Sequence, residues 1–390
     1  MEKPLDCLIK KITAEEIKDS HGDPTIKVTV SVGDKSESFS VPSGASTGVH
    51  EAHELRDQDG KGVQESIKKV NTVISPALIG KNVLNQKEID KTMITIDGTQ
   101  NKDNLGANSI VGVSIACAKV AAKISNQEVY EYLRTLALIK PSRKVPYLFM
   151  NLLEGGKHTV GDLAFQEYHI VPETNNAEEA VNIGIAVQNT LKEIISKDLG
   201  EESVVLGDEG GFAPKTGDIR KPLVYLADAV KQNNLEGKVR FALDVAASSF
   251  FQSAQTSGGW NSFYKISGKN ISALELMNTY NSLIKEFNLF SIEDPFNEED
   301  FYNFKELKEG HKNLLVVGDD LTVSNRTLLE RAIENDSINA IIIKPNQIGT
   351  LSETLETMKL ARENNIELII SHRGRETNDD FIADLAYAFG

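Results

Sequence analysis

Ala340-Ile-Ile-Ile-Lys344 is a short run of β-branched residues that ends in a charged side chain. Runs of this kind are typical of strands that are buried on both faces. Four more runs share the pattern and end in a polar residue: Arg240-Phe-Ala-Leu-Asp244, Leu289-Phe-Ser-Ile-Glu293, Leu315-Val-Val-Gly-Asp319 and Leu368-Ile-Ile-Ser-His372. The segments between them have helical periodicity. Strand, polar tip and helix in repetition predict a TIM-like (β/α) barrel, whose chemistry lies at the C-terminal strand ends.

The polar tips supply three carboxylates, those of Asp244, Glu293 and Asp319, together with Lys344 and His372. Hard divalent cations prefer oxygen ligands, and a lysine beside such a cation is suited to act as a base. The alternative is that these acids are solvated residues at strand ends. Three unpaired carboxylates at one barrel mouth would repel each other strongly, so the pattern favours a metal site.

Composition limits the class of protein. The chain has 390 residues, of which 40% are hydrophobic and 25% charged, and its net charge is −15. This length allows two domains and a large core. An acidic surface argues against nucleic acid or anionic membranes as general partners. The two cysteines form no disulfide framework, the N-terminus is too polar for a signal peptide, and no run reads as long and apolar enough to span a bilayer. We therefore expect a cytoplasmic protein.

The two halves of the chain differ in pattern. Residues 7–42 alternate like strands, with a hairpin turn at Gly33-Asp34, and residues 62–135 are helical in pattern. Pro141 and Pro146 bracket a boundary. This predicts an α+β capping domain over residues 1–140 and a catalytic barrel over residues 141–390. Helical periodicity resumes at residues 379–389 with no strand after it, so the last βα unit of an eight-stranded barrel is expected to be missing.

Helix signals mark the individual segments. The stretch 107–124 is rich in Ala, Val, Ile and Gly and predicts a closely packed buried helix. Residues 177–199 and 223–232 predict amphipathic helices. Two later helices are expected to begin with capping boxes, in which Ser272 pairs with Glu275 and Thr350 with Glu353.

Several sequence blocks resemble one known family. They are Val41-Pro-Ser-Gly-Ala-Ser-Thr-Gly48, Gly207-Asp-Glu-Gly-Gly211, Ser291-Ile-Glu-Asp-Pro-Phe296, Gly318-Asp-Asp-Leu-Thr322, Lys344-Pro-Asn-Gln-Ile-Gly349 and Ser371-His-Arg373. In this order they resemble enolase, phosphopyruvate hydratase, from about residue 12 to the last residue. The resemblance implies Mg²⁺-dependent dehydration of 2-phosphoglycerate to phosphoenolpyruvate in glycolysis and gluconeogenesis. Its difficult step creates an enolate whose charge Mg²⁺ stabilises.

The resemblance also implies residue roles. Asp244, Glu293 and Asp319 would hold the tightly bound Mg²⁺, and Ser46, in a lid loop, would bind a second one. Lys344 would be the general base; the alternative of a structural lysine paired with Asp319 or Asp320 is compatible with that role. Glu209 would be the general acid and Glu167 its partner; two neighbouring carboxylates are costly to ionise together, so one is expected to keep its proton.

The remaining site residues follow from the same resemblance. The implied catalytic residues are Glu209, Lys344, Glu167, His158 and His372. The implied substrate contacts are Gln166, His158, Glu167, Lys344, Ser46, the Arg373 guanidinium on the phosphate and the backbone N–H of Gly374. Taken without this context, a histidine in a loop is more often structural, and the 207–211 block or the 43–48 loop would be an ordinary turn. The glycines at 155–156 form no Walker motif, because the spaced upstream glycine is missing.

The chain departs from the family pattern in three places. Gly374-Arg375 stands where the family has Ser-Gly, so a hydroxyl contact to phosphate is lost, and Arg375 would add positive charge or crowd the site. The family's C-terminal Gly-Gln-Ile-Lys-Thr-Gly block, whose lysine helps to bind the substrate, has no match here. His21 replaces an arginine of the family's dimer region, within an expected homodimer or higher oligomer.

Two further interpretations are compatible with the sequence. A non-catalytic enolase relative with a binding or structural role, with a secondary presence at the cell surface, would fit the missing block and the altered Ser-Gly. A superfamily relative that acts on another acid is disfavoured, because Ser46 and the pair Glu167 and Glu209 resemble enolase itself.

Overall fold

The protein is described by a computed structural model, which describes residues 7–44, 50–141, 145–159, 161–256 and 259–390. The chain divides into two compact units. Unit 1 consists of residues 1–143, 322–330 and 341–390, and unit 2 of residues 144–321 and 331–340. The division into domains 1–140 and 141–390 stays a prediction.

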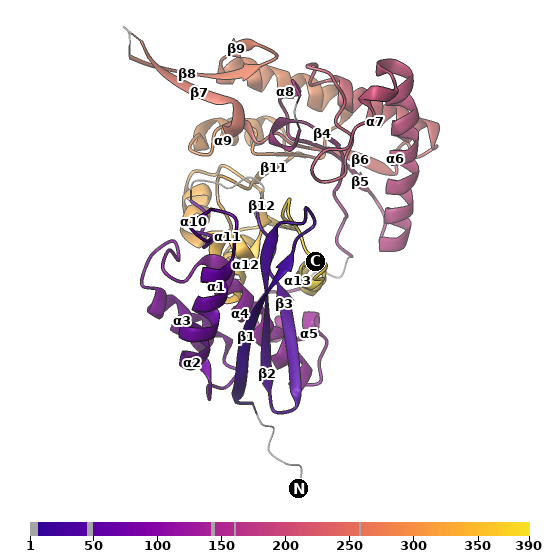
Figure 1. Ribbon diagram of the computed structural model, residues 1–390. Helices are drawn as coiled ribbons and strands as arrows, with labels where there is room; N and C mark the ends of the chain where they lie inside the picture. Colours follow the sequence, from indigo (N-terminus) through magenta and orange to yellow (C-terminus); the bar gives the residue numbers. More distant parts are fainter. Residues whose placement is uncertain (1–6, 45–49, 142–144, 160, 257–258) are drawn as a thin grey trace. The chain divides into compact units, whose positions relative to one another are not determined.

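Unit 1 begins with an antiparallel sheet of β1 (Ile9–Lys18), β2 (Pro24–Val32) and β3 (Lys35–Ser40). Figure 1 shows these long strands side by side. Alternate residues of β2 are fully buried, as in a strand with one face on the core. The turn between β2 and β3 contains Gly33 at a φ of 59°, which confirms the predicted hairpin.

The helices of unit 1 cover this sheet. They are α1 (Gln64–Lys69), the π-helix η1 (Val70–Ile74), α2 (Ser75–Leu78), α3 (Gln86–Asp97), α4 (Ala107–Ile124) and α5 (Val129–Leu136). The α4 helix packs against β2 and β3 with the closeness that its small residues predict. A Cβ on Gly112 of α4 would lie 2.6 Å from the Val28 side chain, so only glycine allows this approach.

The α4 helix also corrects one expectation. By length and composition it is apolar enough to cross a membrane, although no run was expected to be. It is 89% buried, which is typical of the core helix of a soluble fold. It is the one such helix within the part of the chain that the structure describes.

The C-terminal segments complete unit 1. They are β12 (Ala340–Ile343, of which the last three residues belong here), α11 (Pro345–Ile348), α12 (Leu351–Glu363), β13 (Glu367–Ile370) and α13 (Phe381–Phe389). The α13 helix packs on α5, where the rings of Tyr130 and Tyr387 lie 5.0 Å apart. Arg134 Nε donates to the Ala388 carbonyl at 2.7 Å. The short helix α10 (Arg326–Glu334) contains residues of both units.

Unit 2 contains five neighbouring strands in the order β11-β10-β6-β5-β4. They are β4 (Met150–Glu154), β5 (Glu167–Pro172), β6 (Val239–Asp244), β10 (Ser291–Glu293) and β11 (Leu315–Gly318). The strands β6, β10 and β11 are parallel, whereas β5 runs antiparallel to both β4 and β6. The first residue of β5 therefore lies at the same sheet edge as the last residues of β4 and β6.

Helices and a small sheet surround these strands. They are η2 (Gly156–His158), α6 (Ala177–Leu199), η3 (Glu201–Ser203), α7 (Lys221–Gln232), η4 (Ala247–Phe250), β7 (Phe251–Thr256), β8 (Gly259–Ile266), β9 (Lys269–Ile271), α8 (Ala273–Phe287) and α9 (Phe301–Gly310). Figure 1 shows α6 beside α7, which also pack together. The capping box of Ser272 and Glu275 is confirmed at the start of α8. At the start of α12, Thr350 Oγ1 accepts a hydrogen bond from the Glu353 N–H, which is one half of the predicted capping box.

The predicted strands are confirmed as β6, β10, β11, β12 and β13, and the helices at 107–124 and 177–199 have their predicted bounds. The reversal of β5 and the sheet β7-β8-β9 were not predicted. Among the described residues, no strand follows β13, and α13 is the last element.

Candidate active site

Four carboxylates form a row across four strands of unit 2. Glu154 on β4 is the register partner of Glu167 on β5, Glu167 is the partner of Asp244 on β6, and Asp244 is the partner of Glu293 on β10. Residues in register on neighbouring strands point to the same face, about 4.8 Å apart. The strand pairing therefore brings four acidic residues, three of them predicted site residues, to one edge of the sheet.

This row supplies only oxygen donors. Adjacent like charges at strand spacing repel each other, and partial burial in a low dielectric strengthens the repulsion. A hard divalent cation removes this cost and takes carboxylate oxygens as ligands. The donor set of Asp244 and Glu293 therefore fits Mg²⁺.

Asp319 follows β11, and its neighbour Asp294 organises the connection. A carboxylate oxygen from each of Asp294, Asp319 and Asp320 lies within 4.8 Å of the others. The buried Asp294 carboxyl accepts the N–H of Asp319 at 3.0 Å and the N–H of Asp320 at 2.7 Å. Burial, with the charges of Asp320, Asp319 and Asp244, raises the pKa of Asp294 well above its ordinary range. Asp294 thus fixes the backbone that presents Asp319.

His158, Glu167 and Glu209 converge from three segments. One ligand atom from each lies within 4.8 Å of the others. His158 Nδ1 is 3.5 Å from Glu167 Oε1 and 4.0 Å from Glu209 Oε2. His158 ends the short helix η2, Glu167 begins β5, and Glu209 lies in the turn of residues 207–211. The predicted pair of acids is thus in one place with an imidazole beside it.

Gln166 and His169 orient the acids of the row. Gln166 Nε2 donates to Asp244 Oδ2 at 2.9 Å, and His169 Nε2 lies 2.8 Å from Glu167 Oε2. Gln166 is 8% exposed, and its Oε1 has no hydrogen-bond partner among the described residues. A buried acceptor without a partner is costly, which suits a position that contacts a ligand.

Lys344 lies in unit 1, directly after the fully buried strand β12. Its backbone is well fixed: its N–H donates to Ser324 Oγ at 2.8 Å, and its carbonyl accepts the Gln347 N–H at 2.9 Å. Ser324 Oγ in turn donates to Gln347 Oε1 at 2.6 Å. The lysine side chain therefore starts from a rigid strand end.

Arg373, also in unit 1, is 5% exposed. Its Nη1 lies 2.9 Å from Glu51 Oε2 and donates to Asn346 Oδ1 at 3.0 Å. Its backbone N–H donates to the half-buried carboxyl of Glu376 at 3.2 Å, and partial burial raises the pKa of that carboxyl. His372 is exposed and Gly374 half-buried. Ser46 lies outside the described residues.

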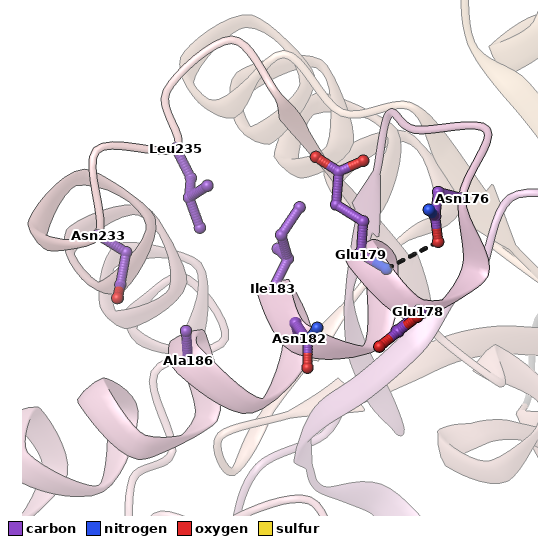
Figure 2. Close-up of a pocket in the computed structure, with 8 residues that line it drawn as sticks. All are labelled: Asn176, Glu178, Glu179, Asn182, Ile183, Ala186, Asn233 and Leu235. Carbon is purple, nitrogen blue, oxygen red and sulfur yellow. Dashed lines mark hydrogen bonds between the residues drawn. The ribbon is translucent and has the colours of Figure 1, made fainter.

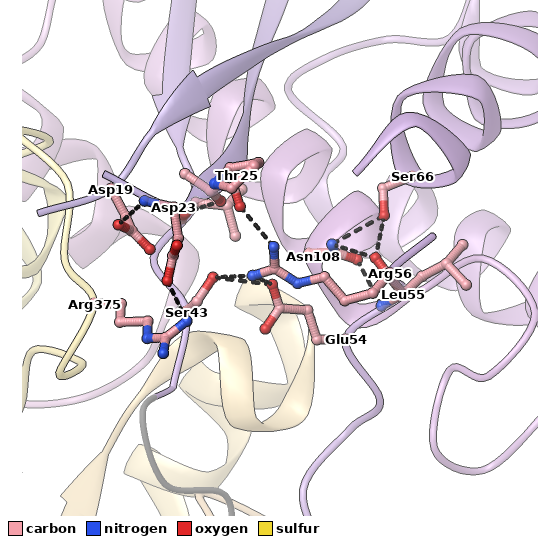
Figure 3. A network of polar contacts seen from close by, with 12 residues as sticks. Asp19, Asp23, Thr25, Ser43, Glu54, Leu55, Arg56, Ser66, Asn108 and Arg375 are labelled. Carbon is pink, nitrogen blue, oxygen red and sulfur yellow. Dashed lines mark hydrogen bonds and ion pairs between the residues drawn. The ribbon is translucent and has the colours of Figure 1, made fainter. Parts of the chain in front are cut away.

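Arg375 is held by the N-terminal sheet of unit 1. Its Nη1 lies 2.7 Å from Asp23 Oδ2, and its backbone pairs with Ser43 through two hydrogen bonds of 3.0 and 3.2 Å. Figure 3 shows Arg375 directed toward Asp23, while Arg56 contacts Ser43 and Glu54. The Arg375 guanidinium thus forms its own ion pair with Asp23 and does not add its charge to that of Arg373.

A pocket of about 420 Å³ opens elsewhere in unit 2, between the start of α6 and the residues after α7 (Figure 2). It is lined by Asn176, Glu178, Glu179, Asn182, Ile183, Ala186, Asn233 and Leu235. This lining contains two acids and no cationic side chain, and none of the predicted site residues. It does not suit a phosphorylated acid.

Sequence reasoning missed four residues on or directly after these strands: Glu154, Asp294, His169 and Asn151, whose Nδ2 donates to Glu209 Oε2 at 3.1 Å. One signal was available for Glu154. It ends the apolar pair Leu152-Leu153 and precedes two glycines, which is the same strand-tip pattern in a shorter run.

Comparison with known proteins gives one consistent result. The family model described as "Enolase, N-terminal domain" matches residues 9–133, and "Enolase, C-terminal TIM barrel domain" matches residues 142–390. The chain is 43% identical to the enolase of Methanocaldococcus jannaschii, over 97% of this chain and 88% of that protein. It is 42% identical to the enolase of Methanosarcina acetivorans, over 98% and 88%. It is 41% identical to enolase 1 of Entamoeba histolytica, over 97% and 88%.

These matches cover both sequence halves and confirm the predicted fold class, a TIM-type barrel with an N-terminal domain. The chain therefore belongs to the enolase family and is a lyase of the phosphopyruvate hydratase type.

Proposed function

We propose that this chain dehydrates 2-phosphoglycerate to phosphoenolpyruvate at the residues predicted from its sequence. The observation that carries the proposal is the register row of Glu167, Asp244 and Glu293, beside the acid pair of Glu167 and Glu209. An acidic row with a bound cation can accept a substrate carboxylate, and a carboxyl pair can provide an acid.

The proposed reaction has two proton transfers. Lys344 removes the proton from C2 of the substrate, and the electron pair remains on the substrate as an enolate. Glu209 then donates a proton to the C3 hydroxyl. The C3–O bond breaks, water leaves, and the electron pair forms the double bond between C2 and C3. A positioned general base or general acid typically contributes about 10²–10⁴-fold to the rate.

Asp244, Glu293 and Asp319 are the proposed ligands of one Mg²⁺, and Ser46 of a second. When bound, Mg²⁺ supplies positive charge against the substrate carboxylate, whose negative charge increases in the enolate. The chain's own groups set this arrangement: Asp294 holds the backbone of Asp319, and Gln166 orients Asp244.

The proposed substrate contacts are a guanidinium, a backbone N–H and several polar side chains. The Arg373 guanidinium and the Gly374 N–H bind the phosphate, since a guanidinium fork matches phosphate oxygens. His158, Gln166 and Glu167 contact the rest of the substrate, with His372 beside the phosphate. Asn346, which accepts from Arg373, restricts the guanidinium before the phosphate arrives.

We also propose a cytoplasmic homodimer. Exposed apolar side chains support association: Val181 and Ile185, four residues apart on α6, are 45% and 52% exposed, and Leu206 is 59% exposed. Exposed apolar patches of this kind favour protein contacts. Light scattering coupled to gel filtration measures the assembly, and a monomeric mass at micromolar concentration would contradict it.

The test of the function is the ultraviolet absorbance of phosphoenolpyruvate formed from 2-phosphoglycerate. We expect formation that stops with a chelator and returns with added Mg²⁺. A folded chain that binds Mg²⁺ but forms no product would instead favour a non-catalytic enolase relative with a binding or structural role.

A further inference from the structure

Glu154 is a buried carboxyl directly beneath the turn that carries Glu209. It ends β4 and is 1% exposed. Its Oε2 accepts the backbone N–H of Glu209 at 3.2 Å, and its Oε1 accepts the N–H of Gly211 at 2.5 Å. Both oxygens of one side chain therefore bind the main chain of a single turn.

The turn packs against this carboxyl without spare room. A Cβ on Gly207 would lie 2.1 Å from Glu154 Oε2, and a Cβ on Gly211 would lie 2.7 Å from Oε1. Real Cβ atoms do not approach oxygens this closely, so both glycines are needed for the contact. The glycines at both ends of the 207–211 turn are therefore explained by the Glu154 carboxyl.

The backbone of β4 continues the attachment. The Glu154 N–H donates to the Phe212 carbonyl at 2.8 Å, and the Phe212 N–H donates to the Leu152 carbonyl at 2.9 Å. Gly207 and Gly211 close the turn through a further bond of 2.8 Å. From the same strand, Asn151 holds the Glu209 carboxylate. Both the backbone and the side chain of Glu209 are thus fixed by β4.

We propose that Glu154 is a positioning residue that holds the 207–211 turn so that Glu209 can deliver its proton to the departing hydroxyl. This inference rests on the proposed function, because it assigns Glu154 to the second proton transfer only. A shift of about 1 Å in a reacting group can cost roughly a hundredfold in rate. The hydrogen bonds of the Glu154 carboxyl go to the backbone of the 207–211 turn, so its role is one of positioning.

The charge around Glu154 is consistent with this role. Burial raises its pKa to about 7, and the charges of Glu209 and Asp208 add to the rise, while the N–H groups of Glu209 and Gly211 oppose it. Glu167, its register partner, is a further acid facing it. Only the ionised carboxylate offers two free acceptors to the two N–H groups.

The test separates the two proton transfers. Glu154→Gln keeps the shape but replaces one acceptor oxygen with an NH₂ donor, which opposes a backbone N–H. We expect exchange of the C2 proton with deuterated water, followed by NMR, to stay within about twofold of wild type. Formation of phosphoenolpyruvate should fall by about tenfold to a hundredfold.

The matched control is Glu309→Gln, which changes an exposed glutamate of α9 beside Lys305 and should alter neither rate. In a second variant, Gly211→Ala, the added Cβ disturbs the same contact with Glu154 from the side of the turn. It should likewise slow formation of phosphoenolpyruvate and leave C2 exchange nearly unchanged. If circular dichroism shows that Glu154→Gln does not fold, the two rates of Gly211→Ala test the positioning role of Glu154 instead.

Each outcome has one meaning. Equal loss of exchange and elimination in the folded variant would overturn the positioning role, and so would retention of both. Absence of C2 exchange in the wild-type chain with Mg²⁺ would instead count against the proposed function.

Discussion

Arg373 and Glu51 form an ion pair of 2.9 Å inside unit 1, with their side chains 5% and 8% exposed. Separating the two charges of a buried pair is costly, because each would be left without compensation. The pair therefore keeps the guanidinium in one position. The cation proposed to bind phosphate is therefore held in place by an acid, whereas Arg375, two residues on, is held by Asp23.

Arg373→Lys should raise KM for 2-phosphoglycerate by roughly tenfold or more, because an ammonium cannot bind phosphate with a planar fork. Arg375→Lys is the matched control, since its ion pair with Asp23 is partly exposed. It should leave KM within about twofold. Steady-state kinetics measure both. Equal effects of the two substitutions would refute the separate assignment of the two arginines.

Lys344→Ala should abolish exchange of the C2 proton, because it removes the proposed base, while Mg²⁺ still binds. Glu209→Gln should keep that exchange and lose dehydration by about 10²–10⁴-fold. Proton NMR in deuterated water and the absorbance of the product measure the two steps separately. Full activity of both variants would show that the roles are wrongly assigned.

Glu293→Gln should weaken Mg²⁺ binding and stabilise the metal-free protein, because it removes one charge from the row beside Asp244. In wild type, Mg²⁺ at about a hundred times its Kd should stabilise the fold by about 2.7 kcal/mol. Thermal unfolding with and without Mg²⁺ checks both effects. Glu299→Gln, in an exposed ion pair with Arg331, is the control. An unchanged response to Mg²⁺ in Glu293→Gln would contradict the ligand assignment.

Asp90 predicts a pH dependence of stability within unit 1. It is 1% exposed, and burial raises its pKa above the ordinary 3.8. Above pH 3.8 the folded state therefore binds more protons than the unfolded state, and the stability from Asp90 falls as pH rises through its folded pKa. Asp90→Asn cannot ionise, so its stability relative to wild type should rise with pH. Urea unfolding across this range measures it; a constant difference would exclude the effect.

Much of the architecture was predictable from local pattern. The runs ending at Asp244, Glu293 and Lys344 are strands because short, mostly apolar segments of this length suit a buried sheet. The direction of β5 was not predictable, since composition does not encode whether a strand runs parallel or antiparallel to its neighbours. Because β5 is reversed, its first residue, Glu167, lies beside the last residue of β6, Asp244.

The finer organisation of the site depends on contacts that spacing does not reveal. Glu293 and Asp294 are adjacent acids, the first at the end of β10 and the second directly after it, so the sequence alone does not say which one holds the backbone of Asp319. Burial decides it: Asp294 is 3% exposed and binds two backbone N–H groups. Glu154 was hidden for the same reason, because its partners lie more than fifty residues away in the 207–211 turn.

The packing of α13 on α5 has a consequence for how the protein is made. Unit 1 joins the first 143 residues to residues 322–330 and 341–390, so the partners of Tyr130 and Arg134 leave the ribosome some 250 residues later. At about 5–20 residues per second, the N-terminal half waits tens of seconds with part of its apolar surface uncovered. Unit 1 therefore completes its folding only after the C-terminal segments are made, whereas the residues of unit 2 are nearly contiguous in the chain.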